Sequence, residues 1–139
     1  MAKSRKSIAK SDFVQRNLEA GLEKLAVASA AGDRAVAVRG KDAKKLGATV
    51  KRLAKRKASA LRRKKTAAKR ARKSPSGETR RALKAAVREL ATVNTQLGKA
   101  RTVKAANAVE YAALRLAQRR ATGYQRAIAQ IDRALRRSA

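Results

Sequence analysis

The chain has 139 residues and a formal net charge of +29, because 38 lysines and arginines are offset by only nine acidic residues. It contains no cysteine and no histidine, which excludes disulfides, thiol catalysis, imidazole acid–base chemistry and Cys/His zinc sites. No apolar run approaches the roughly 18 to 20 residues that a membrane-spanning helix needs.

Two features of the composition point in different directions. Leu, Ile, Val and Phe make up less than a fifth of the chain, and a low apolar share with a high net charge is typical of disordered proteins. Against this, the chain has a single proline, Pro75, and is rich in alanine, the best helix former. We therefore expect long helices with a thin core and marginal stability.

The N-terminal part is predicted to form a basic arm followed by one helix. Residues 1–10 are basic, and we expect a flexible arm there. Over about 11–31 the apolar residues recur at steps of three and four, which predicts a helix with one apolar face. Gly32 suits the C-cap of that helix, and Asp33 can cap the next one.

The second predicted helix, over about 34–73, contains most of the positive charge. Residues 43–77 carry fifteen lysines and arginines and no acidic residue. A narrow apolar seam runs along this basic stretch, within about 80° of one helical line. Its members are Leu53, Ala60, Leu61, Ala67, Ala68 and Ala71. The pattern predicts a helix with one seam for a partner helix and broad cationic flanks for phosphate groups.

A sharp turn is predicted at 74–77, Ser-Pro-Ser-Gly, because proline cannot continue a helix. Helices are expected over about 78–121 and 124–137, with a bend between them. A tight turn makes the two long helices antiparallel neighbours. The predicted fold is all-α: an elongated, coiled-coil-like antiparallel hairpin of long helices, with short helices packed at its open end. Residues 11–139 would form a single helical domain.

The basic hairpin is the strongest indication of function. A small domain needs a net charge of only about 2 to 8 for solubility, so a charge of +29 indicates a polyanionic partner. Adjacent pairs such as Arg62-Arg63 can contact phosphates on both sides of a groove. The candidate nucleic-acid-binding residues are Lys51, Arg52, Lys55, Arg56, Lys57, Arg62, Arg63, Lys64, Lys65, Lys69, Arg70, Arg72, Lys73, Arg80 and Arg81.

Few residues suit base recognition. Single-strand binders stack bases on several aromatic side chains, and this chain has only Phe13, Tyr111 and Tyr124. Each of the three lies on an apolar stripe, so we expect them in the core. Asn94, Gln96 and Asn107 suit either base-edge contacts or a polar helix face. Recognition of a duplex through its backbone and shape is therefore favoured over base reading.

No catalytic constellation is found in the sequence. The nine acidic residues are scattered, and no glycine-rich phosphate loop of the GxGxxG or GxxxxGK[ST] type occurs. We expect no enzymatic activity, no cofactor and no metal. Membrane-surface helices bury Trp, Phe or Leu, whereas the apolar face of the basic stretch is mostly alanine, so we expect no membrane partner.

The stretch KRLAKRKASALRRKKTAAKRARKS, residues 51–74, resembles the Lys/Ala-rich segments of bacterial linker-histone-like nucleoid proteins in composition. The chain differs from them, because it has a single proline, Pro75, and the stretch has a helical seam instead of Pro-Ala-Lys repeats. The resemblance implies a role in chromosome compaction or regulation.

The sequence thus predicts a non-catalytic, sequence-tolerant DNA-binding architectural protein that contacts phosphates and is cytoplasmic and nucleoid-associated. Two alternatives stay open. One is an RNA-binding ribosomal or ribosome-associated protein, because basic helical hairpins that insert between rRNA helices share this composition. The other is a structural protein that self-associates, as a homodimer, through the Leu/Val face of the first and last helices.

Overall fold

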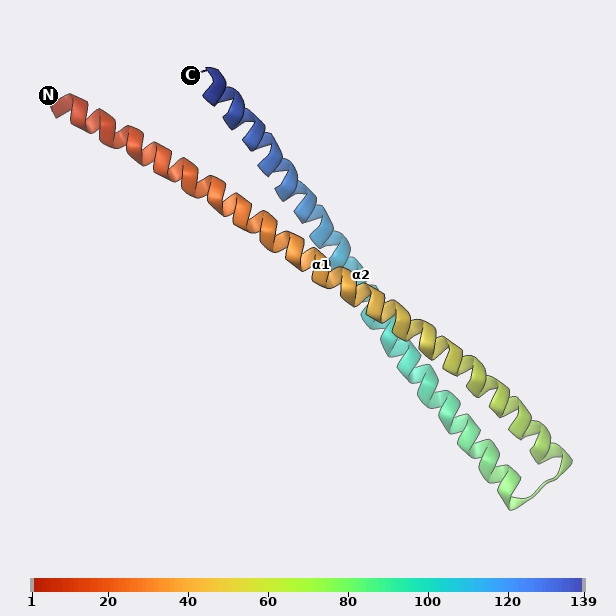
Figure 1. Cartoon of the computed structure of the whole chain (residues 1–139). Coiled ribbons are helices and arrows are strands. Elements are labelled where there is room, and N and C mark those ends of the chain that lie inside the picture. The colour runs from red at the N-terminus through yellow and green to blue at the C-terminus, as the bar shows by residue number, and fades with distance from the viewer. Residues whose placement is uncertain (1, 139) are drawn as a thin grey trace. The chain divides into compact units, whose positions relative to one another are not determined.

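A computed structural model describes the backbone of residues 2–138 and the side chains of residues 12–138. The chain forms two α-helices joined by one short turn, α1 (Ala2–Lys73) and α2 (Gly77–Ser138) (Figure 1). The two helices pack against each other, and residues 2–138 contain no strand. The predicted all-α helical hairpin is confirmed. Residues 2–10, for which the sequence predicts a flexible arm, belong to α1, so the helix begins earlier than predicted.

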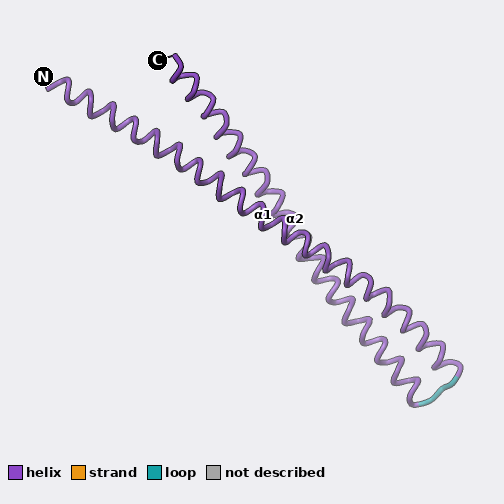
Figure 2. The backbone as a smooth tube through the Cα atoms, viewed as in Figure 1, coloured by secondary structure: helices purple, strands orange, loops and turns teal. Residues whose placement is uncertain are grey.

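The turn lies where the proline predicted it and is held by a reciprocal cap at the start of α2. The Ser76 hydroxyl accepts the backbone N–H of Thr79 at 3.2 Å, and the Thr79 hydroxyl accepts the backbone N–H of Ser76 at 2.9 Å. These contacts satisfy N–H groups that have no partner inside the helix. On the other side of the turn, the Ser74 N–H donates a hydrogen bond to the Arg70 carbonyl and so extends the hydrogen bonding of α1 by one residue. Figure 2 shows this connection as the loop between the helices.

The two other predicted breaks are wrong. α1 runs through Gly32 without interruption, and α2 runs through Gly123, so residues 2–138 form two helices rather than four. No short helix therefore folds back at the open end of the described chain. An isolated glycine costs a helix about 1 kcal/mol relative to alanine, which is too little to end a helix that packs along a partner.

The seam between the helices follows a heptad pattern, with steps of three and four that alternate. Its central members are Leu46, Val50, Leu53, Lys57 and Ala60 on α1, and Ala86, Leu90, Val93 and Leu97 on α2. This average spacing of 3.5 residues is that of a coiled coil. Leu53 and Ala60 are buried against the four α2 residues, which together form the hydrophobic core of the described chain.

The predicted seam of α1 is confirmed in part. Leu53 and Ala60 are 5% and 1% exposed, whereas Leu61 is 39% exposed and lies outside the seam. Nearer the turn, the seam residues Ala67 and Ala71 are only half-buried, because alanines on both helices leave little side chain to interlock. The core is therefore thin, as the composition predicted.

The single predicted helical domain divides into two compact units, and each helix contributes to both. Unit 2 comprises Arg39–Glu110 and contains the turn and the hydrophobic core. Unit 1 comprises Met1–Val38 and Tyr111–Ala139.

In unit 1 the helices meet through a polar contact centred on Gln118. Its Nε2 atom donates to the Ser29 carbonyl at 2.8 Å and to Asp33 Oδ1 at 2.6 Å. A Cβ atom on residue 32 would lie 2.7 Å from Gln118 Cδ and would overlap Oε1. Gly32 therefore makes room for an amide from the opposite helix and does not serve as a C-cap, and Asp33 is not an N-cap.

The aromatic side chains differ from the prediction. Phe13 is 68% exposed and Tyr124 is 55% exposed, so their predicted place in the core is wrong, and Tyr111 is half-buried. The tyrosine rings lie beside guanidinium groups, with Arg115 at 5.5 Å from the Tyr111 centroid and Arg120 at 5.9 Å from that of Tyr124. A hydrogen bond to the Tyr124 hydroxyl raises the pKa of Arg120 above its ordinary value.

Candidate nucleic-acid interface

Every one of the fifteen candidate residues lies in unit 2, on α1 or on the first turns of α2. Unit 2 has 24 basic and four acidic residues, a net charge of +20. Fourteen of the candidates are exposed, and the exception is Lys57, which is half-buried in the seam. Lys57 is therefore the weakest member of the candidate set.

Most of the exposed cations of α1 between residues 44 and 73 form two straight rows, and the candidates Lys64, Lys65 and Arg72 are exposed outside both rows. The steps within each row are of seven and four residues, which keeps each row within about 40° of a line along the helix. The first row consists of Lys44, Lys51, Lys55, Arg62, Lys69 and Lys73. The second row consists of Lys45, Arg52, Arg56, Arg63 and Arg70.

The first row is long compared with the other features of the surface. From Lys51 to Lys73 the helix rises about 33 Å, close to the length of one turn of B-DNA. Lys44 and Lys45 extend the rows by two further helical turns and were missing from the predicted set. Their spacing of seven residues from Lys51 and Arg52 is the signal that could have identified them.

The start of α2 adds a shorter basic face. Arg81, Lys84 and Arg88 follow one another at steps of three and four, and all of them are exposed. Arg80 is exposed beside them. The prediction included Arg80 and Arg81 but stopped before Lys84 and Arg88, which the helical spacing places on the same face as Arg81.

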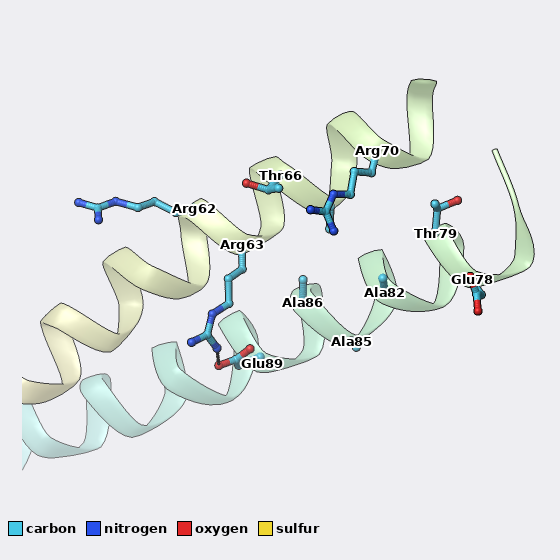
Figure 3. Close-up of a pocket in the computed structure, with 11 residues that line it drawn as sticks. Arg62, Arg63, Thr66, Arg70, Glu78, Thr79, Ala82, Ala85, Ala86 and Glu89 are labelled. Atoms are coloured by element: carbon cyan, nitrogen blue, oxygen red, sulfur yellow. Dashed lines mark hydrogen bonds and ion pairs between the residues drawn. The ribbon is translucent and has the colours of Figure 1, made fainter. Parts of the chain in front are cut away.

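A groove of about 700 Å³ lies between α1 and α2 next to the turn (Figure 3). Four of the eleven residues that line the groove are alanines, Ala67, Ala82, Ala85 and Ala86, whose small side chains leave space between the helices. Arg70 extends from α1 toward α2 in this region, whereas Arg62 points away from the groove. The groove therefore offers both cations and small apolar surface.

Arg63 reaches across the groove to Glu89, with 2.8 Å between Nη1 and Oε1. The two side chains are 65% and 40% exposed, so the pair contributes no more than about 1 kcal/mol to stability. Among residues 12–138, Arg63 is the only candidate residue in an ion pair. The charge of the other candidates is not offset by a contact with an acidic side chain of the described chain.

Asn107 is not available to bases. It is 6% exposed, and its Oδ1 accepts a hydrogen bond from Arg39 Nη1 at 3.2 Å. The second guanidinium nitrogen of Arg39 pairs with Glu110 at 2.7 Å. Asn107 is therefore a polar member of the seam that holds Arg39 in place, and of the two roles left open for this residue the base-edge contact is excluded.

Residues 12–138 contain no group of three or more acidic side chains that could hold a metal ion. Within the same part of the chain, neither helix has a stretch long and apolar enough to cross a membrane. No protein-family model, no curated protein and no solved structure matches this chain.

Proposed function

We propose that the chain is a non-catalytic protein that binds nucleic acid through phosphate contacts from unit 2. The observation that carries this proposal is the pair of exposed cation rows along α1, between residues 44 and 73, in a stretch without acidic residues. Parallel rows of like charge repel each other along a helix, and phosphates offset that repulsion while counterions are released from the duplex.

Duplex DNA is the partner that the rows fit best. Lysine and arginine contacts to phosphates carry no base information, so binding would be tolerant of sequence. Unit 2 contains no aromatic residue on which unpaired bases could stack. These features favour an architectural DNA-binding protein, cytoplasmic and associated with the nucleoid.

Structured RNA is the second candidate, and the charge at the turn favours it. Arg72 and Lys73 end α1, and Arg80 and Arg81 lie in the first turns of α2, so the tip of the hairpin is basic on both helices. A basic tip of this kind suits insertion between RNA helices, where 2′-hydroxyl and phosphate contacts recognise shape.

Competition binding separates these partners. The full chain would be titrated against a DNA duplex, a single strand of the same sequence and a folded RNA, at salt between about 50 and 300 mM. The proposal expects the duplex to bind at least as tightly as the RNA, with a steep loss of affinity as salt rises. Tighter binding to the folded RNA at high salt would favour the ribosome-type function. Binding to none of the three at about 50 mM salt would overturn the proposal.

A further inference from the structure

The most apolar face of α2 in unit 1 does not face α1. Ile131 and Leu135 are 59% and 64% exposed, Tyr124 is 55% exposed, and Ile128 is 37% exposed. On the adjacent face, Gln118 contacts Ser29 and Asp33 of α1. The polar face of this segment is thus the one that packs within the hairpin, and its large aliphatic side chains are left uncovered in the single chain.

These exposed residues belong to a second heptad stripe. Its members, at alternating steps of three and four over three heptads, are Leu114, Ala117, Ala121, Tyr124, Ile128, Ile131 and Leu135. The stripe is continuous with the seam between the helices, because Leu114, Ala121 and Ile128 belong to both patterns. Apolar positions on two adjoining sides are typical of a helix that packs against more than one partner.

Most of the positive charge of this segment lies opposite the stripe, whereas Arg120 and Asp132 lie at its two edges. The exposed arginines of its opposite face are Arg115, Arg119, Arg126, Arg133 and Arg137. They fall within about 40° of one line, roughly 180° from the centre of the stripe. Arg120 lies nearer the stripe, and its guanidinium is held by the hydroxyl and the ring of Tyr124.

The neighbouring segment of α1 offers a matching surface. Val14 and Leu18 are 63% and 58% exposed, and they continue the apolar stripe of α1 beyond Leu22. Gly21 has no heavy atom within 4 Å of its Cβ position, so nothing of the described chain covers α1 there.

We propose that the stripe from Leu114 to Leu135 is the interface through which two copies of the chain associate. None of the seven residues of the stripe is charged, and the flanking Arg120 and Asp132 already contact Tyr124 and Arg136 of the same chain. Such a surface favours an apolar partner over a charged one, and it is complementary to its own copy in an isologous dimer. Unit 2, which carries +20, then stays free on each copy. The dimer does not rest on the proposed function, but one consequence does: a dimer with two basic unit 2 segments links two duplexes.

The salt dependence distinguishes this inference from nucleic-acid binding. Two copies with a charge of +29 each repel one another, and added salt screens that repulsion. Self-association therefore strengthens as salt rises, whereas binding to nucleic acid weakens. Because salt shifts self-association and nucleic-acid binding in opposite directions, an experiment can reject one of the two proposals and leave the other standing.

The test is sedimentation equilibrium of the full chain without nucleic acid, at about 0.15 and 1 M NaCl. We expect a monomer–dimer equilibrium that shifts toward the dimer at the higher salt. The double variant Tyr124→Gln/Ile131→Gln should weaken the dimer at least about tenfold, since both side chains leave the interface. The matched control, Val103→Gln/Val109→Gln, removes two exposed valines of α2 in unit 2, 53% and 72% exposed, and should leave the equilibrium unchanged.

Cross-linking gives a second measurement that does not depend on the stability of the double variant. The chain has no cysteine, so Ile131→Cys and Arg126→Cys each create a single thiol, the first on the stripe and the second on the arginine face. Oxidation should join copies of the Ile131→Cys chain much faster than copies of the Arg126→Cys chain.

Three outcomes would overturn the inference. One is a chain that stays monomeric at both salt concentrations. Another is cross-linking at equal rates from the two cysteine positions. The third is a monomer that binds vesicles of anionic lipid in a way that Tyr124→Gln/Ile131→Gln abolishes, because the stripe would then be covered by a lipid surface.

Discussion

Arg63 on α1 and Glu89 on α2 form an ion pair with 2.8 Å between Nη1 and Oε1, at the edge of the groove beside the turn. Arg63 belongs to the second cation row, so the pair places an acidic side chain against the proposed phosphate-binding surface. A phosphate that approaches Arg63 must compete with the Glu89 carboxylate for the same guanidinium.

Removal of this competitor should tighten duplex binding. For Glu89→Gln we expect a several-fold higher affinity, because Arg63 is freed and one repulsive charge is removed. The free energy of unfolding should fall by less than about 1 kcal/mol, since the pair is exposed. Filter binding and urea denaturation would measure the two effects.

Glu110→Gln is the matched control for that variant, because Glu110 also pairs with an arginine, Arg39, which belongs to neither row, and it lies near only the first residue of the second row, Lys45. It should change the affinity by a smaller factor. Equal gains from the two substitutions would mean that net charge alone sets the affinity and that Arg63 has no particular role.

The half-buried Lys57 leads to a prediction about stability. It lies in the seam between Leu53 and Ala60, where an apolar side chain would be buried without loss of an ion pair. Lys57→Leu should raise the free energy of unfolding by about 1 kcal/mol, within the range for burial of an aliphatic side chain. Thermal unfolding followed by circular dichroism would measure this change.

The same substitution should barely alter nucleic-acid affinity, because Lys57 is on neither exposed row. Arg62→Leu is the comparison, since Arg62 is exposed on the first row. It should weaken binding and leave stability almost unchanged. A larger loss of affinity from Lys57→Leu than from Arg62→Leu would contradict the assignment of the rows.

Gly32 and Gly47 should respond differently to alanine. A Cβ at Gly47 meets no atom within 4 Å, so Gly47→Ala should stabilise α1 by up to about 1 kcal/mol. At Gly32 the Cβ displaces the Gln118 amide and breaks its hydrogen bonds to Ser29 and Asp33. We expect Gly32→Ala to raise the free energy of unfolding by roughly 1 kcal/mol less than Gly47→Ala does.

A double-mutant cycle checks the cause of that difference. In a Gln118→Ala background there is no amide to displace, so Gly32→Ala should become as stabilising as Gly47→Ala. If the deficit at Gly32 persisted without Gln118, the contact between the two residues would not explain why glycine is present.

Binding should be insensitive to pH near neutrality. Histidine is the side chain that ordinarily changes charge between about pH 5 and 8, and the chain has none. The duplex affinity at fixed ionic strength should therefore stay constant between about pH 6 and 8. Fluorescence anisotropy with a labelled duplex would show it, and a tenfold change over this interval would point to a titrating group that the proposed interface lacks.

The hairpin could be predicted from the sequence because its signals are local. Pro75 ends α1, and the alternating three- and four-residue steps around Leu53 and Leu90 define the seam. The helix ends predicted at Gly32 and Gly123 are wrong because glycine is found both at helix C-caps and at close contacts between helices, and the sequence alone does not distinguish the two. The role of Gly32 depends on Gln118 from the other helix, and no local pattern specifies that partner.

The residue types of the candidate interface could be predicted from the sequence. Which of these residues are exposed could be predicted only in part. Lysine and arginine are rarely buried without an ion-pair partner, and an alanine-rich helix forms only a thin core, so the exposure of these residues follows from the sequence. The half-burial of Lys57 and the burial of Asn107 depend on the register between the helices. The exposure of Tyr124 and Ile131 could not be predicted for a different reason, since an apolar stripe does not specify which partner it packs against.

The most direct test of the central claim is the salt dependence of duplex binding for two variants with the same reduction in charge. One replaces Lys51, Lys55, Arg62 and Lys69 of the first row by glutamine. The other replaces the four unit 1 residues Arg115, Arg119, Arg126 and Arg133 by glutamine. All eight residues are exposed, and glutamine preserves helix propensity.

For the first-row variant we expect lower affinity and a shallower slope of log affinity against log salt. The slope should decrease by about 0.9 for each phosphate that the variant no longer neutralises. The unit 1 variant should keep nearly the slope of the unaltered chain. Equal slopes for the two variants would contradict the account, because the cations of unit 2 would then contact no more phosphates than those of unit 1.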